Sequence, residues 1–155
     1  MNRKKNHSER PDTQASRLGR IGEIQAAEFL KIRGYSIAAM NFKTPIGRNR
    51  KGVALTGEID IVAVKDNTVC FVEVKTRSDD PAPQSAVNLR KQRQITRASR
   101  NYLKVFDVGN KKVRYDVISI VARKGRAPQI THFEGFWSPR KYNKIQWSGD
   151  FLSDS

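Results

Sequence analysis

Three charged residues, Asp60, Glu73 and Lys75, lie in or beside two apolar segments of β-strand type. The segments cover residues 59–64 and 69–74, and a turn-forming Asp-Asn pair separates them. This pattern predicts a two-residue β-hairpin in which Asp60 faces Glu73. Their Cβ atoms would lie about 4.5–5.5 Å apart. Lys75 would point to the same side, because side chains alternate along a strand.

Such a group of charges can bind a divalent metal ion. Carboxylates placed opposite each other repel, so a cation between them would stabilise the pair. Mg²⁺ is typically held by one or two carboxylates together with waters and substrate phosphate oxygens, and Lys75 would add a positive charge beside a scissile phosphate. The alternative is a cross-strand ion-pair cluster in which Glu58 faces Lys75, worth at most about 1 kcal/mol. Three acids at one strand end favour the metal site, because acidic residues are depleted inside strands.

The composition predicts a single domain with a polyanionic partner. The 155 residues carry 30 Lys and Arg against 15 Asp and Glu, a net charge of +15. A charge of this size favours nucleic acid over an anionic membrane surface. No segment approaches the ~20 apolar residues of a membrane span, and the basic start lacks the apolar part of a signal peptide. We therefore expect a cytoplasmic protein that does not enter the membrane, with its lone Cys70 buried in a strand.

One domain at residues 15–137 is expected between two tails. Residues 1–14 are predicted to be a disordered basic N-terminal tail, and residues 138–155 an irregular C-terminal tail. Between them the pattern predicts a helix at Ser16–Arg33, a strand at Tyr35–Phe42, a loop at Lys43–Gly57, the hairpin, a helix at Gln84–Phe106, and strands at Val113–Val121 and Gln129–Phe133. Gly34 is expected to end the first helix.

Both faces of the hairpin are apolar, so each needs a covering layer. One face carries Ile59, Ile61, Cys70, Val72 and Val74, and the other carries Val62, Val64 and Phe71. This predicts an α/β fold in three α/β/α layers, with a central sheet flanked by helices. The first helix is expected to pack through residues that share one of its faces: Leu18, Ile21, Phe29 and Ile32.

The second predicted helix has an apolar face and a basic face. The apolar stripe consists of Ile95, Ala98, Tyr102 and Phe106, and the opposite face carries Arg93, Arg97, Arg100 and Lys104. Like charges at these spacings repel, and a phosphate backbone would relieve the repulsion. An ordinary solvated face is the alternative. Four further basic residues are predicted phosphate contacts in the loop that leads to Asp60: Lys43, Arg48, Arg50 and Lys51.

The histidines and tryptophans, which could bind a metal or stack on bases, are assigned to no site. His7 and His132 have no partners at metal-ligand spacing. Trp137 and Trp147 could stack on bases, but packing in the core or the tail is the favoured interpretation.

Asp60 followed by Glu73-Val74-Lys75 resembles the Asp…Glu-x-Lys signature of the PD-(D/E)XK nuclease superfamily. The wider frame is similar to its YraN-like family of predicted endonucleases, in the branch related to Holliday-junction resolvases. The similarity covers about residues 17–137 and rests on an ordered set of short matches. The matches are Gly22-Glu23, Phe29-Leu30 through Gly34-Tyr35, Asn41, Gly57 to Asp60, Phe71 to Arg77, Lys91-Gln92, Tyr102-Leu103 and Arg114 to Val117.

This resemblance implies a restriction-endonuclease-like fold with a central mixed sheet, and metal-dependent hydrolysis of phosphodiester bonds in DNA, branched or otherwise structured DNA included. Asp60 and Glu73 would be metal ligands, with the carbonyl of Val74 as a third. Lys75 would be the catalytic lysine, and Glu23 a supporting acid from the first helix, a role for which Glu28 competes. The implied cofactor is Mg²⁺, with Mn²⁺ as a substitute.

The same frame implies nucleic-acid contacts beyond the basic helix face and the loop, at Arg77, Lys91 and Gln92. Two departures from the superfamily are visible. Ile59 stands where the superfamily name has a proline, and Thr96 stands where RecB-like exonucleases have a tyrosine, which argues against a processive exonuclease.

A different class of function competes with the nuclease. A non-catalytic nucleic-acid-binding protein could keep the same fold and the same basic surface. The sequence does not distinguish DNA from RNA, and although symmetric cutting of two strands would require a homodimer, no segment marks an interface.

Overall fold

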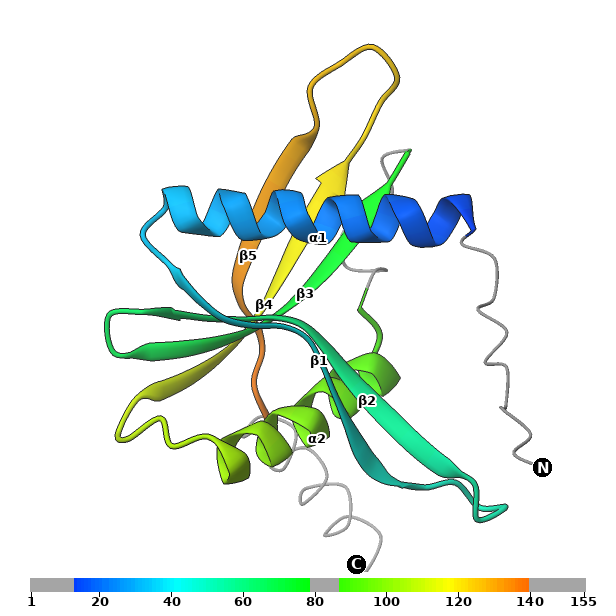
Figure 1. Ribbon diagram of the computed structural model, residues 1–155, viewed down its shortest axis with the longest axis vertical. Coiled ribbons are helices and arrows are strands. Elements are labelled where there is room, and N and C mark those ends of the chain that lie inside the picture. Colours follow the sequence, from blue (N-terminus) through cyan, green and yellow to red (C-terminus); the bar gives the residue numbers. More distant parts are fainter. Residues whose placement is uncertain (1–12, 79–86, 140–155) are drawn as a thin grey trace, which may run out of the picture.

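The computed structural model describes residues 13–78 and 87–139 of the chain (Figure 1). The helices and strands, in chain order, are α1 (Gln14–Ile32), β1 (Ser36–Arg48), β2 (Ala54–Lys65), β3 (Thr68–Arg77), α2 (Leu89–Val105), β4 (Lys112–Val121) and β5 (Gln129–Trp137).

The five strands form one mixed sheet in the order β1-β2-β3-β4-β5. Neighbouring strands are antiparallel except β3 and β4, which run parallel because α2 connects them. The two helices lie on opposite sides of the sheet (Figure 1). The chain therefore has an α/β fold, as the hairpin's two apolar faces predicted.

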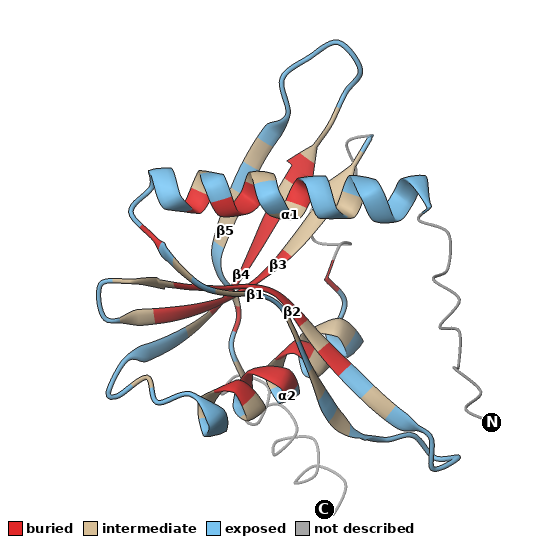
Figure 2. Cartoon of the chain, in the orientation of Figure 1, coloured by how far each residue is buried: buried red, intermediate tan, exposed pale blue. Residues whose placement is uncertain are grey.

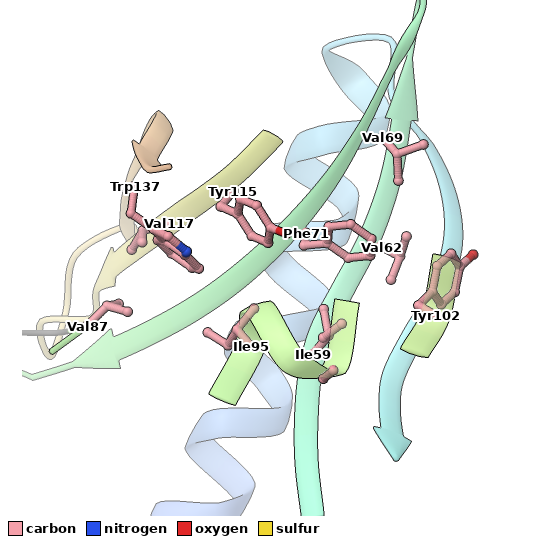
Figure 3. Packing of buried hydrophobic residues seen from close by; sticks show 11 residues of the cluster. Ile59, Val62, Val69, Phe71, Val87, Ile95, Tyr102, Tyr115, Val117 and Trp137 are labelled. Carbon is pink, nitrogen blue, oxygen red and sulfur yellow. The ribbon is translucent and has the colours of Figure 1, made fainter. Parts of the chain in front are cut away.

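Two separate apolar cores hold the helices to the sheet. Under α2, Ile95 and Tyr102 pack with Val62 and Phe71, and Figure 3 shows this cluster from close by. Under α1, Leu30 and its neighbours pack with strand residues that point to the other face, among them Ile61, Cys70 and Val72. Along β3, successive residues alternate between the two clusters, which is the period of a strand buried on both faces.

The β2–β3 hairpin has the predicted register. Val62 pairs with Phe71, and the pairing continues to Ile61 with Val72. Asp66 in the turn has a positive φ of 51°, a conformation that Asp tolerates. One face assignment is wrong, because Ile59 packs in the α2 cluster and not beside Ile61.

Helix α1 has the predicted bounds to within two residues, but it packs through a different face. Gly34, at φ +87°, ends it with the expected left-handed residue. The buried positions are small residues and one leucine (Gly22, Ala26, Ala27 and Leu30), whereas Leu18, Ile21 and Ile32 are exposed. Phe29 is partly buried. The reason is close approach: a Cβ on Gly22 would overlap the hydroxyl of Thr76 on β3.

The predicted loop at Lys43–Gly57 is wrong for most of its length. Strand β1 continues to Arg48 and β2 begins at Ala54, so only the short connection between them is a turn. The edge position of β1 explains this result, because an edge strand tolerates Pro45 without losing a hydrogen bond inside the sheet.

Two other elements differ at their ends. Helix α2 begins at Leu89, because the side chain of Asn88 caps it by accepting a hydrogen bond from the amide of Lys91. Strand β5 extends past Phe133 to Trp137, which stacks on Tyr115 and is buried as expected. Residues 1–12, 79–86 and 140–155 lie outside the described residues, and they include the predicted start of α2, Trp147 and most of both predicted tails. Thr13 and Gln14, predicted to belong to the N-terminal tail, are the N-cap and the first residue of α1.

His132 does have a structural role, which the sequence did not predict. The fully buried carboxylate of Asp116 is 2.8 Å from His132 Nε2 and accepts two hydrogen bonds from Arg114 and one from the amide of Gly135. Burial raises the pKa of Asp116, but the hydrogen bonds from His132, Arg114 and Gly135 outweigh burial and lower it overall. This network fixes β5 on β4.

Gly57→Ala is expected to destabilise the protein by about 1–3 kcal/mol, because α2 packs directly on Gly57. A Cβ there would lie 2.7 Å from Ile46 Cγ2 and 3.1 Å from Ala98 Cβ. The matched control is Gly19→Ala in α1, where a Cβ meets nothing within 4 Å. It should stabilise the protein by about 0.5–1 kcal/mol. Urea unfolding measures both, and an unchanged midpoint for Gly57→Ala would contradict the packing described.

Candidate functional site

The sheet divides at Asp60 and Glu73. The pairing of β2 with β3 stops at Ile61 and Val72, whereas β2 stays paired with β1 as far as Ala54, and β3 stays paired with β4 as far as Arg77. The β1–β2 ribbon and the end of β3 then leave in different directions (Figure 1). We call this point of divergence the fork. It places two acidic side chains where two strands no longer hydrogen-bond each other.

Both carboxylates of the fork are buried, Asp60 with 8% and Glu73 with 2% of its surface exposed. Asp60 Oδ2 accepts a hydrogen bond of 2.8 Å from the amide of Val74, which takes the place of a ladder bond. Glu73 Oε1 lies 3.3 Å from Lys75 Nζ and 3.7 Å from Lys91 Nζ. Glu73 Oε2 is buried and has no hydrogen-bond partner within the described residues.

The electrostatics of the fork disfavour two negative charges. Burial, the charge of Asp60 and a hydrogen bond with the Asp60 carboxyl together raise the pKa of Glu73 to about 7. Lys91 and Lys75 lower that pKa, but they do not compensate for burial. Near neutral pH the pair therefore either holds a proton or favours a bound cation. A buried carboxylate oxygen that accepts no hydrogen bond is able to bind a metal ion.

Helix α1 brings one further acid to the fork. Burial and the charge of Asp60 raise the pKa of Glu23, so its carboxylate lies within electrostatic range of Asp60. Glu28 is exposed and forms a 3.0 Å ion pair with Lys31. Of the two candidate acids in α1, Glu23 is the one near Asp60.

Asn41 is a residue at this site to which sequence reasoning gave no role. It lies on β1 between the pairs Met40–Ile61 and Phe42–Ile59, so it stands beside Asp60. Its side chain hydrogen-bonds Glu23, and its φ of +52° is left-handed. Asn adopts this conformation more readily than most residues, so an Asn inside an apolar strand was the available signal.

The donor set fits a metal ion that also uses water and substrate as ligands. Within residues 13–78 and 87–139, no three His, Cys, Asp or Glu side chains are grouped closely enough to hold an ion by themselves. Asp60 and Glu73 provide two carboxylates, one of them with an oxygen that has no other partner. Mg²⁺ prefers this arrangement of few protein ligands and several waters.

The predicted nucleic-acid contacts occupy three kinds of position. The exposed ones are Lys43, Arg48, Arg50 and Lys51 on the β1–β2 ribbon and Arg93, Arg97, Arg100 and Lys104 on α2. Arg77 is partly buried at the end of β3, and Lys91 reaches Glu73 in the fork. Gln92 donates a 3.0 Å hydrogen bond to the carbonyl of Val87, so it fixes the segment before α2.

Glu58 does not face Lys75. Because β2 has left β3 at this point, Glu58 pairs with Lys43 on β1. The observed ion pair of Lys75 is with Glu73. Of the predicted ion-pair cluster, the pair between Glu58 and Lys75 is therefore missing, and Lys75 pairs with Glu73 instead.

Comparison with known proteins shows the family of the chain. Residues 22–120 match the model of the Uncharacterised protein family UPF0102. A UPF0102 protein of Syntrophotalea carbinolica is 41% identical over 120 residues, which cover 76% of this chain and 89% of the relative. One from Chlorobium limicola is 38% identical over 128 residues (77% and 92%), and one from Solibacter usitatus is 38% identical over 119 residues (76% and 83%). The chain belongs to the UPF0102 family.

The matched region of the family model contains the complete fork. It begins at Gly22, one residue before Glu23, and includes β1, β2, β3 and α2. In the part of the chain that the structure describes, neither helix is long and apolar enough to cross a membrane.

Glu73→Gln is expected to stabilise the protein above neutral pH. A carboxyl whose pKa is raised to about 7 by folding contributes stability that is fully present below its unfolded pKa and is lost as the pH rises through 7. Glutamine cannot ionise, so at pH 8 the variant should gain about 1–3 kcal/mol in free energy of unfolding over the native protein. Urea unfolding between pH 5 and pH 9 measures this difference.

The matched control for this experiment is Glu58→Gln, which removes one negative charge from a partly buried position on β2. Its unfolding free energy should follow that of the native protein over the whole pH range. If Glu73→Gln also follows the native protein, then burial does not raise the pKa of the Glu73 carboxyl.

Proposed function

We propose that this protein is a metal-dependent endonuclease that hydrolyses phosphodiester bonds in DNA. The observation that carries the proposal is the buried pair of carboxylates, in which the charge of Asp60 raises the pKa of Glu73 and Glu73 Oε2 has no hydrogen-bond donor among the described residues. A buried acceptor without a partner is costly, and a divalent cation is the ligand that both carboxylates favour. The resemblance to PD-(D/E)XK nucleases is the independent support.

In this proposal Asp60 and Glu73 would hold Mg²⁺ or Mn²⁺, with the Val74 carbonyl as a third ligand. When bound, such an ion would supply a water of lowered pKa and would stabilise charge on the phosphoryl group. Val74 also fixes Asp60, because its amide donates a hydrogen bond to Oδ2. Lys75, held 3.3 Å from Glu73 Oε1, would stabilise the negative charge of the transition state.

The basic surfaces support a nucleic-acid substrate. The chain has a net charge of +15, and exposed Lys and Arg side chains lie on α2 and on the β1–β2 ribbon. Phosphates that bind to these surfaces release counterions, so we expect binding that weakens with salt. A mixed sheet with one helix on each side agrees with the three-layer, restriction-endonuclease-like arrangement that the proposal requires.

Asp60→Asn should abolish Mg²⁺- or Mn²⁺-dependent nicking of plasmid DNA, with a loss of about a thousandfold or more. The amide keeps the hydrogen bond from Val74 but loses the charge that would bind the metal. Lys75→Met should lower cleavage by about 10²–10³-fold. The matched control is Asp66→Asn in the turn of the same hairpin, which should cleave at the native rate.

DNA binding, measured by fluorescence anisotropy in EDTA, should survive in all three variants. Equal cleavage by the native protein and Asp60→Asn would overturn the assignment of the site. Salt-sensitive binding without cleavage in any metal, on duplex, single-stranded, flap and four-way DNA, would instead support the non-catalytic nucleic-acid-binding alternative.

Asn41→Gly should weaken metal binding without destabilising the fold. Glycine accepts the left-handed φ of Asn41 but removes the amide that holds Glu23 near Asp60. We expect the half-saturating Mn²⁺ concentration for cleavage to rise about 10–100-fold, with thermal stability unchanged. Asn41→Asp is the comparison, because it keeps the backbone and adds a charge. A native Mn²⁺ requirement in Asn41→Gly would show that Asn41 does not position Glu23.

A further inference from the structure

The outer part of the β1–β2 ribbon is a rigid projection, which we call the basic arm (residues 43–56). Its two strands pair with each other from Pro45–Thr56 to Arg48–Ala54, beyond the point where β3 has separated. Glu58, which pairs with Lys43, lies at the base and outside the arm. Figure 2 shows that most of this stretch is exposed, in contrast to the buried centre of the sheet. The arm therefore extends from the fork without being part of the core.

Helix α2 supports the base of the arm. Asn101 donates hydrogen bonds to the carbonyl of Pro45 at 2.8 Å and to Thr44 Oγ1 at 3.3 Å. Ile46 packs against the α2 core, and Gly57 lies against α2 with no room for a side chain. These contacts fix the direction of the arm relative to Asp60.

The tip of the arm is ordered by its own hydrogen bonds. Asn49 Oδ1 accepts from the amides of Lys51 and Val53, both at 2.9 Å, and the guanidinium of Arg48 donates to the carbonyl of Gly52 at 2.7 Å. Arg50 and Lys51 remain exposed on this turn. A fixed turn that presents two cations outward is suited to binding phosphates at a defined place.

The charge of the arm has a single sign. Residues 43–56 contain two lysines, two arginines and no acidic residue. They also contain no aromatic residue, so the arm has no surface on which unpaired bases could stack. This composition favours the phosphate backbone of a double helix over a single strand.

The length of the arm sets where those phosphates lie. From Asp60 to Ala54 the strand advances by about 20 Å at ~3.3 Å per residue. One base pair advances a duplex by about 3.4 Å, so the tip is about six base pairs from the fork along a duplex that follows the arm.

We propose that the basic arm clamps double-helical DNA, with Arg50 and Lys51 binding backbone phosphates about six base pairs from the phosphodiester held at the fork. The inference rests on the proposed nucleic-acid function of the fork and names its substrate class: DNA with a continuous duplex flank on one side of the reacting bond. The arm acts on binding and register, and it contributes no group to the chemistry.

The test compares the full chain with Arg50→Ala/Lys51→Ala in binding to duplexes of about 6, 9, 12 and 18 base pairs, measured by anisotropy in EDTA. The hydrogen bonds that order the tip survive both substitutions, because they come from main-chain amides and Asn49. The matched control is Lys111→Ala/Lys112→Ala, which removes the same charge at the opposite end of the sheet, where Lys112 pairs with Thr68.

We expect the two arm substitutions to leave the affinity for the shortest duplex unchanged and to weaken binding about tenfold at 12 base pairs and above. On the longest duplex, the slope of log affinity against log salt should fall by about 2, one for each phosphate that the arm no longer binds. The control variant should match the native protein at every duplex length. With single strands, the effect of the arm substitutions on affinity should not rise with strand length.

An arm effect of equal size at all lengths, or a larger effect on single strands, would overturn the clamp. These measurements need no cleavage. If no metal supports nicking, the nuclease proposal fails while the clamp is still judged by the length dependence. If nicking is found and the length dependence is absent, only the clamp fails.

Discussion

The structure depends on the separation of β2 from β3 directly after Ile61 and Val72. Because the strands part, the ladder leaves backbone groups to be satisfied in another way, and the carboxylate of Asp60 accepts the amide of Val74. The same separation releases the β1–β2 ribbon from the sheet and gives it a direction of its own. The acidic pair and the basic arm thus have one structural cause.

The position of the helices relative to this fork is set by small residues. Gly22 and the alanines of α1 let that helix approach β3 closely, which brings Glu23 into range of Asp60. Gly57 has the same function for α2, whose Lys91 reaches Glu73 from the other side of the sheet. Each helix therefore places a charged side chain at the fork, Glu23 from α1 and Lys91 from α2. A buried pair with a raised pKa is a local loss of stability, which a protein keeps where the site has a use.

The sequence was sufficient for the hairpin because its signals are local. The apolar runs on either side of Asp66 and Asn67 fix the turn and the register, and the register places Asp60 near Glu73. The packing face of α1 could not be predicted in the same way. Leu18, Ile21 and Ile32 form the more apolar stripe, but the close approach at Gly22 selects the stripe of small residues instead. The sequence predicts a loop for the arm because Pro45, Gly47 and Gly52 are turn formers in isolation. The edge strand β1 accommodates Pro45 and Gly47, and only Gly52 lies in the turn.

The sequence by itself determined the acidic pair, its lysine and the basic character of the chain, because each follows from residue type and spacing along one or two strands. The family model matches residues 22–120, which include the C-terminal part of α1, all of α2 and the fork. Only the tertiary structure decided that Asn41 holds Glu23, that Lys91 joins Glu73, and that His132 supports Asp116 in a separate network. The physical reason is that these contacts join side chains from different strands and helices. Their geometry depends on how closely the layers pack, which no periodicity in the chain records.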